Sequence, residues 1–148
     1  HKQITRRYLA TVAYICSHLL NEQLIDVYDI YPDGVESEEI NLYIDYLVSK
    51  QYILVNKGVL TLTDKGKSYV KKLLTNPDNR KARVYYRAAH QVMSLTNDVT
   101  IAIASYLFFS RFSSSLKGFS KIKKLYNEIK DYISIFIDKE KVKEKQVV

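Results

Sequence analysis

The sequence predicts a mainly α-helical protein that carries one small β-hairpin, followed by further helices. Apolar residues recur at steps of three and four along most of the 148 residues, which is typical of amphipathic helices. Only two prolines and four glycines interrupt the chain. One pair of short segments rich in β-branched residues flanks a turn at residues 56–58 and predicts the hairpin.

The first predicted helix spans residues 4–20. Its apolar face is formed by Ile4, Tyr8, Leu9, Val12, Ile15, Cys16, Leu19 and Leu20. Residues 24–31 are rich in β-branched and aromatic side chains but too short for periodicity to decide, so a short helix and an extended link both remain open. The residues Pro32, Asp33 and Gly34 predict a turn.

A second helix is predicted over residues 37–50. Ser37 is its candidate N-cap, and Glu38 and Glu39 lie in the first turn, where the helix dipole favours carboxylates. Its predicted apolar face consists of Ile40, Tyr43, Ile44, Leu47 and Val48.

The hairpin is predicted to pair residues 52–55 with residues 59–62 around a tight turn at Gly58. Its inward face should consist of Ile53, Val55, Leu60 and Leu62. Thr63 or Asp64 then caps a helix over residues 65–74 with Gly66 in its first turn.

Three more helices are predicted after the break at Pro77: residues 78–95, residues 98–113 with a cap at Asn97 or Asp98, and a last helix from Gly118. Ser113–Ser115 is the expected linker between the last two. The charged tail, residues 139–145, is expected to fray. We therefore divide the chain into a domain of residues 1–76 and a helical extension of residues 77–148.

The helical extension offers more apolar surface than the first domain can bury, which predicts a homodimer. Residues of the last helix alternate in steps of three and four, like a short coiled-coil seam. The predicted dimer interface consists of Ile103, Leu107, Phe112, Phe119, Ile122, Tyr126, Ile129, Ile133 and Phe136. The alternative is that both helices pack back on the core of one chain.

The stretch from Leu42 to Leu74 contains a helix end at residues 44–50, a strand start at Tyr52, a turn at Gly58 and the segment Leu62-Thr63-Asp64-Lys65-Gly66. This order resembles the winged helix-turn-helix regulators of the MarR and PadR type, whose wing leads into the next helix through a Leu-Thr-x-x-Gly segment. Gln51 and Tyr52 stand where many such proteins have Lys-Gly. The abundant Tyr, Ile and Lys are also similar to those of proteins from thermophilic archaea or archaeal viruses.

The resemblance implies a sequence-specific, double-stranded DNA-binding protein that regulates transcription. It implies that the helix 37–50 enters the major groove and that the wing tip, residues 56–58, reaches a phosphate or the minor groove. Lysine and arginine side chains beside the wing would contact phosphates. The expected DNA-binding residues are Ser37, Glu38, Asn41, Asn56, Lys57, Gly58, Lys65, Lys67, Arg80 and Arg83.

Charge distribution both supports and opposes DNA binding. The chain holds 23 Lys and Arg against 16 Asp and Glu, a net charge of +7. Residues 51–95 carry nine bases and two acids, whereas residues 26–50 carry one base and seven acids. An acidic helix is a poor approach surface for DNA, so a second interpretation remains open: a winged-helix protein-interaction module in a replication, transcription or partition complex, with a basic partner at residues 26–50.

Neither catalysis nor a cofactor is expected. Cys16 and His18 lie two residues apart on one helix and do not face each other, and the single cysteine favours a structural role. Residues 87–90 place an arginine near a histidine, but such a short spacing is common by chance. No metal-ligand spacing or phosphate-binding glycine loop is present. We expect a cytoplasmic protein without a signal peptide or membrane span.

Overall fold

The computed structural model describes residues 3–112 and 118–147, so the linker expected at Ser113–Ser115 lies outside the described residues. Within them the chain is mainly helical with two small antiparallel hairpins. The elements are α1 (Arg6–Leu19), β1 (Asp29–Tyr31), β2 (Gly34–Glu36), α2 (Glu38–Ser49), β3 (Ile53–Asn56), β4 (Val59–Leu62), α3 (Asp64–Thr75), α4 (Arg80–Met93), α5 (Asn97–Phe109) and α6 (Ser120–Val147).

Side-chain caps fix the starts of the helices. Ser37 and Thr63 cap α2 and α3, as the sequence predicts, and accept hydrogen bonds from the N–H groups of Ile40 and Gly66. The predicted cap of α5 at Asn97 or Asp98 is wrong. Thr96 has the extended backbone and accepts from Val99 N–H, so Asn97 is already helical.

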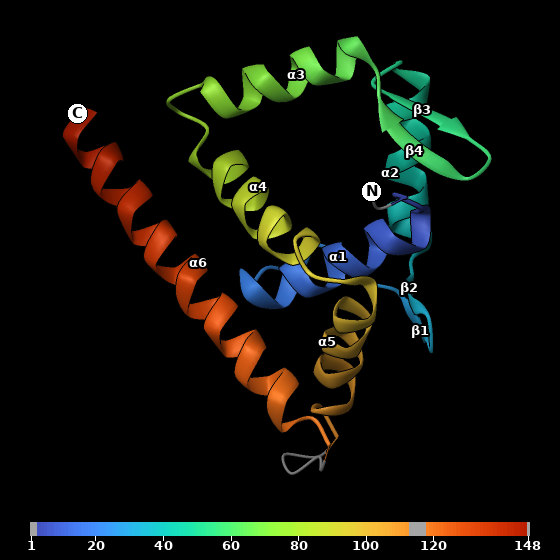
Figure 1. Ribbon diagram of the computed structural model, residues 1–148. Helices are drawn as coiled ribbons and strands as arrows, with labels where there is room; N and C mark the ends of the chain where they lie inside the picture. The colour runs from blue at the N-terminus through green and yellow to red at the C-terminus, as the bar shows by residue number, and fades with distance from the viewer. Residues whose placement is uncertain (1–2, 113–117, 148) are drawn as a thin grey trace.

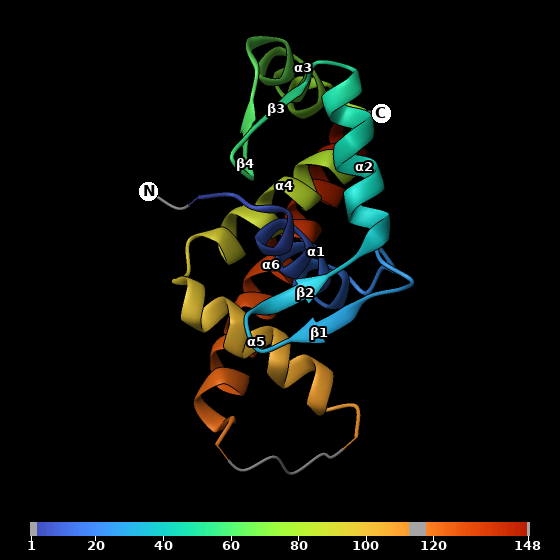
Figure 2. The same ribbon diagram turned by 90° about the vertical axis from the view of Figure 1, so that its right-hand side faces the viewer.

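The segment left open at residues 24–31 ends in strand β1, which pairs with β2 to form a hairpin that the sequence did not predict. The hairpin packs on α1 through Val35, which is fully buried and whose N–H donates to Thr11 Oγ1 at 2.8 Å. Figure 2 shows this hairpin beside α1. Strand structure here depends on a partner on α1, which local sequence does not reveal.

The predicted hairpin β3–β4 is confirmed, with Val55 opposite Leu60 and Ile53 opposite Leu62. Leu60 is buried, and its N–H donates to the carbonyl of Ile4, the residue that leads into α1, at 2.7 Å. The inward position predicted for Leu62 is wrong, because this side chain lies at the open end of the hairpin and stays 45% exposed.

Helix α1 is the centre of the main core. Its buried face packs against α4, α5 and α6, and α3 connects the β3–β4 hairpin to α4 along one edge of the molecule (Figure 1). The proposed domains 1–76 and 77–148 therefore share one hydrophobic core. Its principal buried residues are Ala10, Val12, Ile15, Cys16, Leu19, Val35, Ala88, Val92, Ile103, Leu107, Tyr126, Ile129 and Ile133.

This packing limits the predicted dimer interface. Five of its residues are buried in the core of the single chain: Ile103, Leu107, Tyr126, Ile129 and Ile133. They pack among α1, α4, α5 and α6 of the same chain, because the apolar face of α6 lies against the other three helices. These side chains are not available to a partner chain, whereas Phe112 is exposed.

The charged tail does not fray at residue 139 as expected, because α6 continues to Val147. Within the predicted tail, Glu140 is 4% exposed, and its Oε2 accepts from Arg83 Nε at 2.9 Å, which holds this part of α6 against α4. In the described part of the chain no helix by itself is long and apolar enough to cross a membrane; α4 and α5 pass that test only as a pair bent by 114°.

Candidate nucleic-acid interface

A group of aromatic and basic side chains gathers where α2 ends, β3 begins and α3 begins. We call it the lysine–tyrosine surface, and it consists of Tyr46, Lys50, Tyr52, Lys65 and Tyr69. Tyr52 and Tyr69 stack with ring centroids 4.6 Å apart. The ammonium groups of Lys65 and Lys50 lie 5.2 Å and 5.6 Å from the ring centres of Tyr52 and Tyr46.

The end of α2 has the hydrogen bonds of a Schellman motif. Gln51 has φ +65°, and its N–H donates to Val48 O, while the N–H of Tyr52 donates to Leu47 O. A residue other than glycine thus holds the left-handed position. Thr63 Oγ1 donates to the Gln51 carbonyl at 2.6 Å and ties the start of α3 to this corner.

Lys65 reinforces the same corner, because its Nζ donates to the carbonyl of Lys50 at 3.1 Å. Carbonyl groups at a helix C-terminus carry partial negative charge and attract an ammonium group. Residues 50–75 contain six lysines and only one acidic residue, Asp64. This part of the chain therefore combines positive charge with exposed aromatic rings, a composition suited to nucleic acid.

The tip of the β3–β4 hairpin points away from the core (Figure 1), and Asn56, Lys57 and Gly58 are all exposed. Lys57 and Gly58 have φ values of +51° and +77°, the signs that a type I′ turn requires. Glycine takes such angles without strain, whereas lysine does so at a cost of about 1 kcal/mol. The turn places Lys57, with its ammonium group, at the outermost point of the hairpin.

Much of the acidic charge of residues 26–50 is balanced within the molecule. Arg6 pairs with Asp45 at 2.6 Å, and Arg7 pairs with Asp33 at 2.6 Å and with Glu36 at 3.3 Å. Glu39 accepts hydrogen bonds from the backbone N–H groups of residues 26 and 27. The exposed α2 surface is consequently less acidic than its sequence suggests.

The DNA contacts predicted at α2 differ in exposure. Glu38 is exposed, but Ser37 is 2% exposed and its hydroxyl is occupied by Ile40 N–H and by the Val27 carbonyl. Ser37 therefore cannot contact DNA as predicted. Asn41 is half-buried, and Arg6 donates to its carbonyl oxygen at 3.3 Å.

Sequence reasoning missed the large hydrophobic side chains that α2 exposes, Leu42, Tyr43 and Tyr46. It assigned Tyr43 to the apolar face, and that assignment is wrong. The buried contact of α2 is narrow and centres on Ile44, which is 1% exposed. A narrower apolar face, centred on Ile44, would have placed Tyr43 and Tyr46 on the exposed side of α2.

The predicted basic contacts also differ in availability. Lys65 and Lys67 are exposed on α3, and Arg80 is half-buried on α4. The guanidinium of Arg83 instead joins α4 to α6 and to the preceding turn. Besides Glu140 it binds the carbonyls of Asn76 and Pro77 at 2.7 Å and 3.2 Å, so the predicted DNA contact of Arg83 is wrong.

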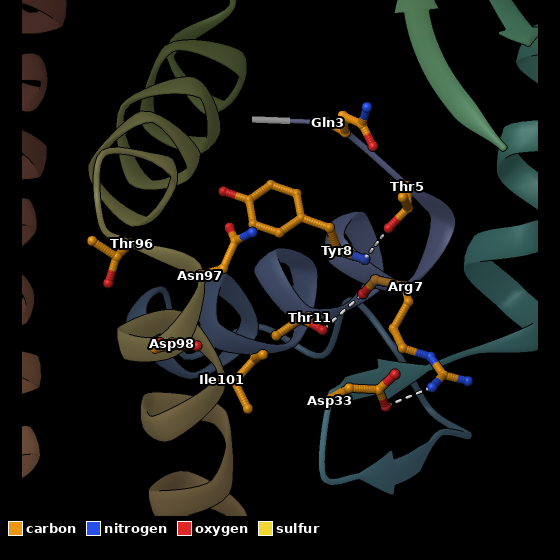
Figure 3. Close-up of a pocket in the computed structure, with 10 residues that line it drawn as sticks. All are labelled: Gln3, Thr5, Arg7, Tyr8, Thr11, Asp33, Thr96, Asn97, Asp98 and Ile101. Atoms are coloured by element: carbon orange, nitrogen blue, oxygen red, sulfur yellow. Dashed lines mark hydrogen bonds and ion pairs between the residues drawn. The ribbon is translucent and has the colours of Figure 1, made fainter. Parts of the chain in front are cut away.

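A groove of about 840 Å³ lies between the first turns of α1, the β1–β2 turn and the start of α5 (Figure 3). Its central groups already have partners. Arg7 and Asp33 form an ion pair, and Thr11 Oγ1 donates to the Arg7 carbonyl while accepting from Val35 N–H. These contacts hold the β1–β2 hairpin against α1.

Three of the residues considered for catalysis, Cys16, His18 and Arg87, contact neighbouring side chains or are buried. Burial raises the pKa of the Cys16 thiol to about 12, so the thiol stays protonated at neutral pH. Burial also lowers the pKa of His18, whose ring contacts Tyr14 edge-on. Arg87 lies 4.8 Å from the centre of the Phe136 ring and donates to the Tyr132 hydroxyl at 3.2 Å.

Comparisons with protein-family models, curated proteins and solved structures found no match to this chain.

Proposed function

We propose that this protein is a sequence-specific double-stranded DNA-binding protein with a winged-helix domain and that it acts as a homodimeric transcriptional regulator. The lysine–tyrosine surface beside the β3–β4 hairpin is the observation that carries the proposal. It joins the end of α2, the wing and the start of α3 into one basic, aromatic surface. Duplex DNA offers the matching chemistry, a regular array of phosphates.

Phosphate contacts would come from Lys57 at the wing tip and from Lys67, which is exposed on α3. The Lys65 ammonium is partly occupied by the Lys50 carbonyl. Base contacts would come from the outward side of α2, where Glu38 and Tyr43 are exposed, and Glu38 suits an amino group such as cytosine N4. The pairing of Asp45 with Arg6 reduces the repulsion between α2 and phosphates.

The order of elements supports a winged-helix domain with one departure. Helix α2 runs directly into the β3–β4 hairpin and then α3, as in the regulators that the sequence resembles. Between α1 and α2, however, residues 29–36 form a hairpin rather than a further helix. In the proposed domain, the β1–β2 hairpin and the Arg6–Asp45 ion pair therefore hold α2 against α1.

Salt-dependent binding to a mixed-sequence duplex tests this function. We expect affinity to fall steeply with salt and the variant Lys57→Ala/Lys67→Ala to reduce the slope by about 2, since each lost phosphate contact removes about 1. The control Lys121→Ala/Lys124→Ala removes the same charge from exposed positions on α6 and should leave the slope unchanged. No binding at low salt, or equal slopes for both variants, would contradict the proposal. Selection from a random-sequence duplex library should then enrich one motif.

The dimer requires a surface other than the buried residues of α5 and α6. The outer side of α6 exposes Tyr132, Ile135 and Val142 at steps of three and seven, a spacing that suits a helix pair. A two-fold axis along this side would present two wings to a palindromic operator. We expect light scattering to find a dimer that Ile135→Asp converts to a monomer. The control Leu54→Asp, at an exposed leucine on β3, should leave the dimer intact. A parent protein that is already monomeric would contradict the proposed dimer.

A protein-interaction module remains the second candidate. It is favoured by Leu42, Tyr43 and Leu54, large apolar side chains that are each more than half exposed near the wing. On this alternative α2 and β3 bind a partner protein, and the exposed acidic residues Asp29 and Glu38 would contact its basic groups. Failure of the folded protein to bind duplex DNA at low salt would favour this function over the first.

A further inference from the structure

The corner between α5 and α6 lies at one end of the molecule, and both Figure 1 and Figure 2 show it opposite the end that carries α3. The two helices pack against each other, and Tyr106 of α5 contacts Phe119, just before α6, with ring centroids 5.9 Å apart. The end of α5 therefore lies beside the start of α6. We call the aromatic and basic side chains there the phenylalanine–lysine corner, and they are Phe108, Phe109, Phe112, Lys121, Lys123 and Lys124.

Two phenylalanines of this corner are exposed to water. Phe112 is 74% exposed, the largest value among the exposed large hydrophobic side chains of the described residues, and Phe109 is 46% exposed. Both rings contact Phe108 edge-on, with centroid distances of 5.6 Å and 5.3 Å. The three rings therefore form one apolar cluster, and an exposed cluster of this kind marks a contact site more often than a single exposed side chain does.

The three lysines add positive charge beside the rings. Residues 99–127 contain five Lys and Arg and no Asp or Glu. Lys121, Lys123 and Lys124 are exposed within about 6 Å of the start of α6, whereas Glu128, the first acidic residue of this helix, lies about 12 Å along it. The helix dipole disfavours lysine in a first turn, so these ammonium groups do not serve to stabilise α6.

Arg111 lies between the exposed rings in the sequence but is engaged beside them. Its Nη1 donates to the Tyr28 hydroxyl at 2.6 Å, and it shares a cavity wall at the C-terminal end of α1 with Asp26. Asp26 balances part of the Arg111 charge. The positive charge of the corner therefore rests on its three lysines.

We propose that the phenylalanine–lysine corner docks on the surface of a lipid bilayer that contains anionic lipids. The rings of Phe109 and Phe112 enter the boundary between headgroups and acyl chains, and the lysine ammonium groups contact lipid phosphates. Membrane-surface segments combine phenylalanine with lysine in this way, and such a peripheral contact needs no membrane-spanning helix.

The chemistry of the corner favours a bilayer over other anionic partners. Duplex DNA presents phosphates but keeps its bases stacked inside, so it would leave Phe109 and Phe112 in water. An acidic protein would need an apolar recess that fits both rings, whereas an anionic bilayer offers an apolar interior beneath negative headgroups over its whole surface. The corner shares no residue with the lysine–tyrosine surface, and this inference does not rest on the proposed DNA-binding function.

Sedimentation of the full chain with vesicles of equal parts phosphatidylglycerol and phosphatidylcholine tests the proposal. We expect binding at least about tenfold stronger than to phosphatidylcholine alone, and a decrease with salt. Lys121→Ala/Lys124→Ala should weaken this binding at least about tenfold, since each lysine near an anionic surface contributes about fivefold. The control Lys57→Ala/Lys67→Ala removes the same charge from the opposite part of the molecule and should leave vesicle binding unchanged.

A tryptophan at the corner distinguishes insertion of the rings from a purely ionic contact. The chain contains no tryptophan, so Phe112→Trp supplies a single fluorophore. Its emission should shift to shorter wavelength on the anionic vesicles, because the indole leaves water. Leu54→Trp, at an exposed position on β3, should show no shift. Phe112→Ser should weaken vesicle binding at least about fivefold, and Leu54→Ser should not.

Three results would overturn the proposal: no binding to anionic vesicles, equal losses of vesicle binding in the two lysine variants, or an unchanged emission of Phe112→Trp on vesicles. Weaker duplex binding by Lys121→Ala/Lys124→Ala with unchanged vesicle binding would assign the corner to nucleic acid instead. Failure of the parent protein to bind duplex DNA would contradict the proposed function alone, because the vesicle experiments contain no DNA.

Discussion

Gly66 has a steric role that its place in a helix conceals. A Cβ atom at this position would lie 2.1 Å from the carbonyl oxygen of Tyr52, which packs against the first turn of α3. Replacing a helical glycine with alanine normally stabilises a helix by about 1 kcal/mol, but here the added methyl would push α3 away from the start of β3.

We therefore expect Gly66→Ala to lower the free energy of unfolding by about 2 kcal/mol in urea denaturation. Ser68→Ala is the matched control, since Ser68 is exposed on the same helix and its change should stay within about 0.5 kcal/mol. A Gly66→Ala variant as stable as the parent would refute the close approach.

Residues with strong local preferences were predictable, and residues whose role depends on a distant neighbour were not. Ser37 and Thr63 were identified as caps because a hydroxyl before an apolar helix bonds to the helix's own backbone. The resemblance to winged-helix regulators also made Ser37 a DNA contact, and that expectation failed because the buried Ser37 hydroxyl donates to the Val27 carbonyl. No sequence pattern marked Gln51 for its left-handed backbone.

At the scale of elements, the end of α6 depends on a single buried carboxylate. Glu140 is held by Arg83 and lies 3.8 Å from Lys143 Nζ. In Figure 1 the end of α6 lies near the corner between α3 and α4 that Arg83 also holds. The carboxylate and the guanidinium therefore join α4, α6 and the turn that precedes α4.

We expect Glu140→Ala to lower the free energy of unfolding by about 2 kcal/mol, because it leaves the largely covered guanidinium of Arg83 without its anionic partner. Asp138→Ala, an exposed acidic position on the same helix, should change stability by less than about 0.5 kcal/mol. Chemical denaturation followed by circular dichroism compares them. Equal losses in both variants would show that helix propensity, and not the ion pair, sets the stability of this end.

Elements with a clear period were predictable from sequence, and elements defined by their partners were not. The β3–β4 hairpin has an explicit turn with β-branched flanks, and it forms where expected. The β1–β2 hairpin forms because Thr11 and the buried side of α1 receive Val35. The seam of α6 was correctly seen as apolar, but periodicity does not tell whether another chain or the same chain covers it.

At the scale of the whole molecule, the core contains groups that resist ionisation. Burial raises the pKa of Cys16 and the pKa of Tyr126 to about 12, from 9.0 and 10.0 respectively. The native state therefore keeps protons that the unfolded chain releases at alkaline pH. Stability has its full value below pH 9 and decreases as the pH rises from 9 toward 12.

We expect the free energy of unfolding to fall by about 3 kcal/mol between pH 8 and about pH 10.5, of which Cys16 contributes about 2. Urea denaturation at both pH values measures the change. Cys16→Ala should be less stable than the parent at pH 8 because it leaves a cavity, but its stability should fall less over this interval. A loss as steep as that of the parent would show that Cys16 does not contribute to the alkaline decrease.

The shared core also has a consequence for synthesis on the ribosome. The buried face of α1, including Val12, Ile15 and Leu19, is covered by helices that are translated much later, with α6 the last of them. Contacts so distant along the chain form late. A nascent chain that ends after α3 would therefore still expose the apolar face of α1 to chaperones. Native packing of α1 can be completed only when α6 has left the ribosome.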